Sequence, residues 1–238
     1  MPVRREELVR MRDTIAYRGP DATDLYLEPT FGLGHCRLAV IDLGGGHQPM
    51  RSSDGNFVIA FNGEIYNFRE LATLYLRDVH LQTASDTEVL LELFARYGEA
   101  CLPWLNGMFA FAIWDRAAQT LTLARDRFGK KPLYYADFGD TFLFGSEPKA
   151  LLAHPRLTRE PDPEALVQYL LYEYIPGPRS AFRQIRRVPP ASRIRVTAEE
   201  MSLTTWWHLP TVVRGRVQHP AADILTEADA LLSTAVRR

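Results

Sequence analysis

Five positions between residues 37 and 86 carry groups that suit the binding of a free amino acid: Arg37, Asn62, Gly63, Glu64 and Asp86. The planar guanidinium of Arg37 matches an α-carboxylate, and two carboxylates can accept hydrogen bonds from an α-ammonium group. An Asn side chain and an adjacent backbone amide can donate to the oxyanion that forms when a side-chain amide is attacked. The set therefore suits recognition of a zwitterion and acyl-transfer chemistry at its amide.

Each of these residues also has a simpler explanation. Asn62-Gly63 between two apolar runs is a strong signal for a hairpin turn. Asp86 suits the first turn of a helix, where the helix dipole favours an acid. Arg37 also fits a charged strand face, and Glu64 fits a solvated turn. Residue types and spacing alone leave both interpretations open.

The elements that position these residues follow from the hydrophobic periodicity. A helical period predicts a helix over 4–16, and a period of two predicts a strand over 31–42. A second strand is predicted over 57–61, where Asn62-Gly63 ends it. The first candidate site residue thus lies on one strand and the next three follow another.

A well-marked helix follows. Ser85 and Glu88 form a Ser-x-x-Glu capping box ahead of an apolar helical pattern, which places Asp86 in the first turn, and Gly98 ends the helix. Short runs rich in aromatic and β-branched residues predict further strands at 108–114, 120–124, 133–136 and 141–145. Hairpin-linked strands between helices predict an antiparallel, layered α+β domain.

The composition limits the classes of protein that fit. The 238 residues are 46% apolar with a formal net charge of −1, which is typical of a globular protein and gives no overall attraction to nucleic acid or anionic membranes. No apolar run reaches membrane-spanning length, no signal sequence is recognisable, and the usual metal and nucleotide motifs are absent. We expect a cytoplasmic protein with no metal site and no membrane or nucleic-acid partner.

Eight ordered blocks of sequence resemble the glutamine-hydrolysing domain of asparagine synthetases. The blocks are 18–21 (RGPD), 34–38 (GHCRL), 46–50 (GHQPM), 61–67 (FNGEIYN), 85–88 (SDTE), 107–111 (GMFAF), 125–135 (RDRFGKKPLYY) and 146–151 (SEPKAL). The resemblance implies a class II glutamine amidotransferase domain of the N-terminal-nucleophile hydrolase type, an α+β four-layer sandwich of two antiparallel sheets between helices. It assigns 1–207 to this domain, lacking its first strand, and 208–238 to a linker and the first helix of a truncated synthetase domain.

The resemblance also implies roles for the candidate residues. Arg37 would bind the glutamine α-carboxylate, Glu64 and Asp86 would hold the α-ammonium group, and Asn62 and Gly63 would form the oxyanion hole. The backbone of the residues after Arg37 would line the same pocket, namely Leu38, Ala39, Val40 and Ile41.

The implied partners and cofactors come from the same resemblance. Ammonia released from glutamine would pass to a C-terminal synthetase domain that uses ATP and Mg²⁺ to make asparagine. The Ser-Gly-Gly-x-Asp-Ser loop that grips ATP is absent from this sequence, so we expect no cofactor in this chain. The expected partners are glutamine and the C-terminal synthetase domain, with a homodimer as a further option.

The sequence departs from the family at its nucleophile. The family uses a cysteine at position 2 whose own amino group is the base, whereas this sequence has Pro2 and begins about where the first helix begins. Strand alternation turns Cys36 away from Arg37, and Cys101 lies among apolar residues. We therefore expect no glutamine hydrolysis. Two interpretations remain open, a hydrolase domain that lacks its first strand and a non-catalytic glutamine-binding or partner-docking module.

Overall fold

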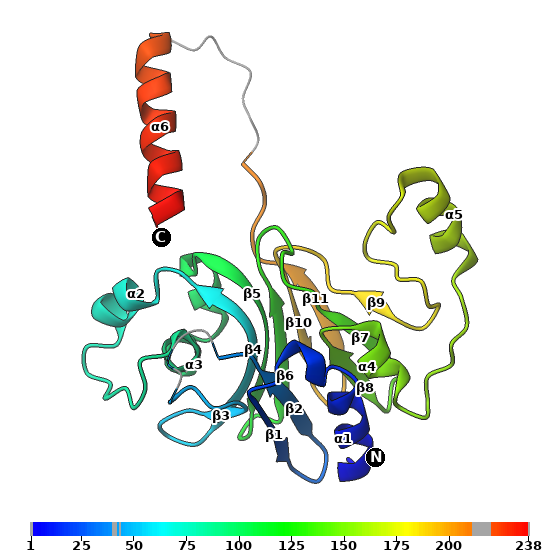
Figure 1. Ribbon diagram of the computed structural model, residues 1–238. Coiled ribbons are helices and arrows are strands. Elements are labelled where there is room, and N and C mark those ends of the chain that lie inside the picture. Colours follow the sequence, from blue (N-terminus) through cyan, green and yellow to red (C-terminus); the bar gives the residue numbers. More distant parts are fainter. Residues whose placement is uncertain (1, 40–41, 43, 211–219, 238) are drawn as a thin grey trace. The chain divides into compact units, whose positions relative to one another are not determined.

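The computed structural model describes residues 2–39, 42, 44–210 and 220–237. Its contacts divide the chain into two units, Met1–Trp207 and His208–Arg238. The first unit stacks helices and sheets in layers (Figure 1). The second contains α6 (Ala221–Arg237), whose Leu225 and Leu232 are exposed. Among the described residues, no helix is long and apolar enough to cross a lipid bilayer.

A six-stranded antiparallel sheet forms one inner layer, with the strand order β11-β10-β6-β5-β4-β3. Its strands are β3 (Met50–Arg51), β4 (Phe57–Ile65), β5 (Gly107–Asp115), β6 (Thr120–Arg125), β10 (Ser192–Val196) and β11 (Met201–Thr205). The outer face of this sheet is covered by α2 (Phe68–Tyr75), α3 (Asp86–Tyr97) and the 3-10 helix Gly98–Trp104.

Two smaller sheets make up the second inner layer. One pairs β1 (Ala22–Leu27) with β2 (Gly32–Arg37). The other has the order β8-β7-β9, with β7 (Tyr134–Asp137), β8 (Phe142–Gly145) and β9 (Arg186–Arg187). Helix α1 (Arg5–Asp13) contacts both β2 and α4 (Pro148–Leu152), and α4 contacts β8. The two small sheets therefore share one helical cover, and the predicted four-layer α+β arrangement is confirmed.

Alternation along the central strands divides the core in two. Ile59 and Phe61 of β4 pack on the side of α3. Val58 and Ala60 face the small sheets. The paired strand β5 repeats the pattern, because its side chains also alternate between the two sides. A sheet buried on both faces needs apolar residues at successive positions, which is why β4 and β5 are near-continuous apolar runs.

The predicted helix with its Ser85 cap is confirmed, with one difference at the capping box. Ser85 Oγ accepts from the Glu88 amide at 3.2 Å, and Gly98 with φ 57° ends the helix. The Glu88 carboxylate accepts from the amides of Gln82 and Thr83, at 2.7 and 2.6 Å, where a capping box predicts the Ser85 amide. Glu88 thus anchors the loop before the helix. The four strands predicted after it are confirmed to within one residue at each end.

The prediction of a turn at Asn62-Gly63 is wrong. Strand β4 continues through both residues, with Asn62 opposite Ala110 and Gly63 opposite Phe109 in β5. A local turn preference is weaker than a nine-residue ladder with a buried partner strand. Asn62, Gly63 and Glu64 therefore lie within strand β4 and not in a turn after it.

Two other predicted elements are shorter than expected. The strand predicted over 31–42 ends at Arg37, because the Asp21 carboxylate accepts from the Ala39 amide at 2.8 Å and turns the chain out of the sheet. The helix predicted over 4–16 ends at Asp13, and the 3-10 turn Ala16–Arg18 follows it.

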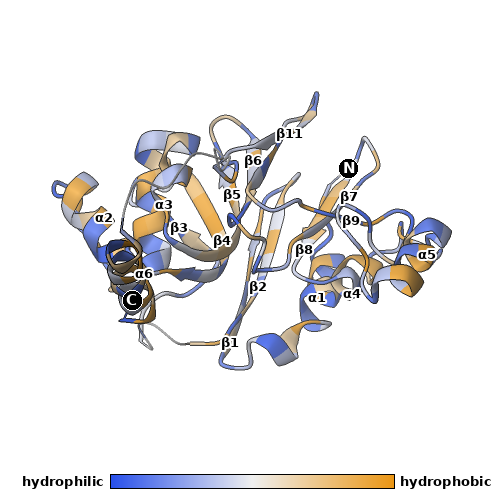
Figure 2. Ribbon diagram, turned by 90° about the horizontal axis from the view of Figure 1, so that it is seen from above, coloured by the Kyte–Doolittle hydropathy of each residue, from blue (hydrophilic) through white to orange (hydrophobic). Residues whose placement is uncertain are grey.

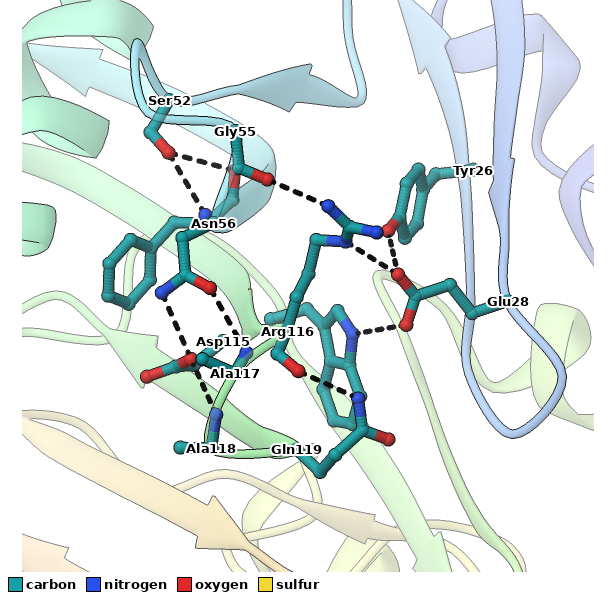
Figure 3. A network of polar contacts seen from close by, with 12 residues as sticks. Tyr26, Glu28, Ser52, Gly55, Asn56, Asp115, Arg116, Ala117, Ala118 and Gln119 are labelled. Carbon is teal, nitrogen blue, oxygen red and sulfur yellow. Dashed lines mark hydrogen bonds and ion pairs between the residues drawn. The ribbon is translucent and has the colours of Figure 1, made fainter.

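Glu28 joins the β1–β2 hairpin to the large sheet. Its carboxylate accepts from Trp114 Nε1 at 3.0 Å, from Arg116 Nε at 2.6 Å and from the Tyr26 hydroxyl. Arg116 also donates to the Gly55 carbonyl at 3.1 Å, so one cluster links three turns (Figure 3). Burial alone would raise the pKa of Glu28, but these hydrogen bonds and the Arg116 charge lower it to about 2.

The Glu28 cluster predicts a pH-dependent contribution to stability. A carboxyl whose folded pKa lies below its unfolded value, about 4.3, stabilises the fold above that value and loses the effect as the pH falls toward 2. We expect Glu28→Gln to lower the free energy of unfolding by about 1–2 kcal/mol near pH 7 and by much less near pH 3.5, measured by urea unfolding. Glu200→Gln, at an exposed carboxylate with no ion pair in the described structure, is the matched control. An equal loss at both pH values would contradict the assigned role.

Candidate active site

A cavity of about 1240 Å³ lies between the two inner layers. Its lining includes the five candidate residues Arg37, Asn62, Gly63, Glu64 and Asp86. Sequence positions almost fifty residues apart thus meet at one hollow, on β2, β4 and α3. The cavity exceeds the roughly 300–1,000 Å³ of a typical small-molecule pocket, so a free amino acid fills only one part of it.

Strand β4 supplies two of the side chains. Because alternate residues of a strand point to one face, Asn62 and Glu64 share the face of Ala60, which looks toward the small sheets. The Nδ2 group of Asn62 is buried and has no hydrogen-bond partner within the described residues. A buried amide donor without an acceptor costs free energy unless a ligand supplies one.

The backbone of β4 offers a second donor beside it. On the edge of β4 that faces away from β5, the Phe61 amide donates to Gln48 Oε1 at 2.6 Å and the Ile65 amide to Asp86 Oδ2 at 2.9 Å. Alternate residues of an antiparallel ladder direct their N–H groups to the same side. The Gly63 amide therefore points to this edge too, between two occupied positions. Outside the strand ladder, the described part of the chain shows no acceptor for it.

Glycine is required at position 63 by the approach of β5. A Cβ atom there would lie 2.7 Å from the Cα atom of Phe109 and closer still to the Met108 carbonyl oxygen. No side chain fits at position 63. The absence of a side chain lets β4 and β5 pair closely, and this pairing fixes the position of the Gly63 amide at the cavity.

Asp86 is held at the end of β4 by its position in the first turn of α3. Its side chain is buried, and burial raises the pKa of Asp86 above its ordinary value. The charge of Glu64 acts in the same direction, whereas hydrogen bonds from the Ile65 and Thr87 amides oppose it. Two neighbouring carboxylates of which one is desolvated favour a cation between them.

Arg37 lies across the cavity from β4, at the end of β2 in the second inner layer. Its side chain is buried at the end of β2, and its Nη2 donates to the Asp42 carbonyl at 2.5 Å. Gly46, with φ 65°, approaches the Arg37 guanidinium closely. A Cβ atom at position 46 would lie 3.0 Å from Arg37 Nη2, so a glycine suits this approach. The guanidinium and the two carboxylates thus border the same cavity, which is the charge pattern that an amino-acid zwitterion needs.

The predicted pocket backbone after Arg37 is only partly placed by the structure. Leu38 lines the cavity but is 59% exposed. Ala39 does not line the cavity, and its amide binds the Asp21 carboxylate. Val40 and Ile41 lie outside the described residues.

Two cavity residues were not assigned a role from the sequence. Gln48 bridges β4 and α3, since its Nε2 also donates to Thr87 Oγ1 at 3.3 Å. His35 Nε2 donates to the Phe61 carbonyl at 3.1 Å, and burial lowers the pKa of His35 to about 4, so the imidazole is neutral at pH 7. Both lie inside sequence blocks that carry the family resemblance, which was the only signal available for them.

Neither cysteine is an activated thiol. Burial raises the pKa of Cys36, whose Sγ lies 3.5 Å from the Arg12 carbonyl under α1. Burial raises the pKa of Cys101 to about 12. A thiol is nucleophilic as the thiolate, so neither environment supplies a nucleophile near pH 7.

Comparison with known proteins decides the family. A family model described as a glutamine amidotransferase domain matches residues 2–207. The chain belongs to the glutamine amidotransferase domain family. The glutamine-hydrolyzing asparagine synthetase 3 of Bacillus subtilis is 38% identical to this amidotransferase domain over 210 residues, which cover 86% of the chain and 34% of the relative. A putative glutamine-hydrolyzing asparagine synthetase 2 of Methanocaldococcus jannaschii is 32% identical over 229 residues, 87% of the chain and 44% of the relative.

Solved structures support the same fold. A structure described as the allosteric regulatory enzyme of purine biosynthesis superposes with a TM-score of 0.54 at 25% identity, covering 74% of this chain and 35% of that one. The glutamine phosphoribosylpyrophosphate amidotransferase of B. subtilis gives the same TM-score at 24% identity, again over 74% and 35% of the two chains. The predicted N-terminal-nucleophile fold and the resemblance to asparagine synthetases are thus confirmed. This amidotransferase domain spans about a third of the length of the B. subtilis synthetase.

Proposed function

We propose that this amidotransferase domain binds glutamine for an asparagine synthetase and that the cavity of Arg37, Asn62 and Asp86 is the glutamine site. The observation that carries the proposal is the pair of unpartnered donors, Asn62 Nδ2 and the Gly63 amide, beside a buried cation and two carboxylates. Arg37 binds the α-carboxylate, while Glu64 and Asp86 accept from the α-ammonium group. The side-chain carbonyl then lies at the two donors, which stabilise the negative charge that forms on its oxygen during attack.

Hydrolysis by this site needs a nucleophile from a further segment. We propose that a cysteine-bearing first strand, supplied by a longer form of the protein, lies in the cavity between β2 and β8. Both strands have an unpaired edge in the described sheets, residues of both line the cavity, and α1 and α4 cover the two together. The 238-residue chain then binds glutamine without hydrolysing it, because an oxyanion hole alone gives only residual acceleration.

The remaining steps of asparagine synthesis belong, in this proposal, to a C-terminal synthetase domain in the cytoplasm. ATP and Mg²⁺ act there. Within the part of the chain that the structure describes, no group of three His, Cys, Asp or Glu side chains could hold a metal ion. In this proposal the 238-residue chain recognises glutamine, and the form with the cysteine-bearing first strand also releases ammonia from it.

Calorimetry and product analysis test the proposal. We expect saturable binding of glutamine to the 238-residue chain and glutamate release at background. An extended form that begins with Met-Cys-Gly upstream should hydrolyse glutamine, and the same form with Ser at that Cys should only bind it. If the upstream DNA does not encode Met-Cys-Gly in frame, glutamine binding without hydrolysis would support the second interpretation, a non-catalytic glutamine-binding module. Absence of glutamine binding would refute the proposed site. Glutamate release that Cys36→Ala abolishes would refute the expected lack of hydrolysis by the 238-residue chain.

A further inference from the structure

Strand β2 directs the side chain of His35 toward the large sheet. Its neighbours on the same strand face, Leu33 and Arg37, are buried, and Leu33 belongs to the same apolar core as Val58 of β4. Strand β2 lies next to β4, whose first half is apolar (Figure 2). The His35 side chain lines the cavity, and its Nε2 donates to the Phe61 carbonyl at 3.1 Å. His35 is thus a polar group between the two inner layers, beside the proposed glutamine site.

The bond to Phe61 fixes which nitrogen of the ring carries the proton. A carbonyl oxygen only accepts, so Nε2 is protonated and Nδ1 of the neutral ring has a bare lone pair. Burial lowers the pKa of His35 to about 4, the charge of Arg37 acts in the same direction, and the Phe61 bond opposes both. The ring is therefore neutral at pH 7, and Nδ1 is a hydrogen-bond acceptor.

This acceptor has no hydrogen-bond partner within the described residues. Four buried side-chain nitrogen or oxygen atoms of the described residues lack a partner, and two of them, His35 Nδ1 and Asn62 Nδ2, belong to residues that line the cavity. One of the two is an acceptor and the other is a donor. A buried polar atom without a partner costs free energy, which a ligand of the opposite polarity can relieve. The pair therefore suits a group that offers both an acceptor and a donor, as a carboxamide does.

The acceptor lies beside the two proposed oxyanion donors. The amide and the carbonyl of Phe61 lie on the edge of β4 that faces away from β5, where Gln48 and His35 bind them. In an antiparallel ladder the Gly63 amide points to the same edge and is the next N–H group along it. Asn62 lies between these two positions, with its side chain on the face toward the small sheets. A carboxamide whose oxygen accepts from Asn62 and Gly63 therefore places its nitrogen near the His35 ring.

We propose that His35 Nδ1 accepts a hydrogen bond from the side-chain NH2 group of bound glutamine and thereby selects a carboxamide over a carboxylate. This role of His35 rests on the proposed glutamine site, to which it adds the group that recognises the amide nitrogen. A glutamate carboxylate has no N–H group to offer, so it would leave Nδ1 unpaired and bring a negatively charged oxygen toward its lone pair. A site built to bind an N–H group rejects a ligand without one, because its buried acceptor then stays unsatisfied.

Two substitutions separate the acceptor from the bond to Phe61. In His35→Gln the amide nitrogen can replace Nε2 and keep the bond to the Phe61 carbonyl, while the Nδ1 acceptor is lost. In His35→Asn an amide oxygen can replace Nδ1, while the bond to Phe61 is lost. His80→Gln, at an exposed histidine that does not line the cavity, is the matched control.

Titration calorimetry on the 238-residue chain compares two ligands, glutamine and the 5-methyl ester of glutamate. The ester keeps the side-chain carbonyl but has no N–H group beside it. We expect His35→Gln to weaken glutamine binding at least about tenfold and to leave the affinity for the ester within about twofold of the wild type. His35→Asn should retain more affinity for glutamine than His35→Gln, and His80→Gln should bind both ligands as the wild type does. The wild type itself should prefer glutamine to the ester by at least about tenfold.

Three outcomes would overturn the role of His35 and leave the proposed glutamine site in place. An equal loss of both ligands in His35→Gln would show that the histidine only supports the packing of β2 against β4. Full affinity of His35→Gln for glutamine would show that Nδ1 does not bind the ligand. A wild type that binds glutamine and the ester equally would show the same, and this measurement needs no variant. Absence of glutamine binding by the wild type, in contrast, would refute the site itself and this role with it.

Discussion

Arg37→Met is expected to weaken glutamine binding by about two orders of magnitude, roughly 3 kcal/mol. The guanidinium is buried at the cavity, so a bound α-carboxylate would exchange water for two parallel charge-assisted hydrogen bonds. Without the cation, the desolvated carboxylate has no partner. Arg37→Lys keeps the charge but loses the planar fork, so its affinity should fall between those of the other two proteins. Titration calorimetry with glutamine measures all three.

A structural effect of Arg37→Met can be separated from the loss of a direct contact. Arg37 also donates to the Asp42 carbonyl, so its removal loosens the loop that follows β2. A glutamine analogue without the α-carboxylate, 4-aminobutanamide, resolves the two. If Arg37 binds the carboxylate, the wild type and Arg37→Met should bind this analogue equally weakly. Arg69→Met, at an exposed arginine on α2, is the matched control. Full affinity of Arg37→Met for glutamine would remove Arg37 from the site.

Gly63→Ala is expected to lower the free energy of unfolding by about 3 kcal/mol or more and to abolish glutamine binding. The added methyl would overlap the Met108 carbonyl and lie 2.7 Å from the Cα atom of Phe109. Both are backbone atoms of β5, which is paired on both sides, so the strands must separate. Separation also moves the Asn62 side chain and the Gly63 amide. Urea unfolding and calorimetry measure the two effects.

The matched control for this change is Gly44→Ala. Among the described residues, no atom beyond its own chain neighbours lies within 4 Å of a Cβ at Gly44, and its φ lies outside the range that side chains rarely adopt. We expect its stability to stay within about 0.5 kcal/mol of the wild type. Should Gly63→Ala keep full stability and affinity, the close approach of β4 and β5 would not be what positions the proposed oxyanion donors.

The sequence predicted the elements whose signals are local. The helix from Asp86 to Tyr97 was predicted because its Ser85 cap, its apolar stripe and its terminal Gly98 lie within fourteen residues of one another. The short strands after it were predicted for the same reason. A cap or an alternation depends on neighbours along the chain, so sequence alone determines it.

The candidate site residues could be identified from the sequence blocks, but their arrangement in space could not be predicted from them. Asn62-Gly63 has the local signature of a turn, and only pairing with β5 makes it part of a strand. Likewise the edge of β4 at Gly63 has no paired strand, because β3 pairs with β4 only at Val58 and Ile59. The amides of Phe61 and Ile65 on the same edge are bound by the side chains of Gln48 and Asp86. These residues come from different elements, and no local rule relates them.

The α+β class, the order of most elements and the family resemblance could thus be predicted from the amino-acid sequence. Only the folded structure shows that Arg37 on β2, Asn62 and Glu64 on β4 and Asp86 on α3 share one cavity, and that the apolar helix α5 (Pro163–Tyr172) is largely exposed within the described first unit. The physical reason is that burial and strand pairing are set by contacts between distant segments. Such contacts can override a local preference, as they do at Asn62-Gly63.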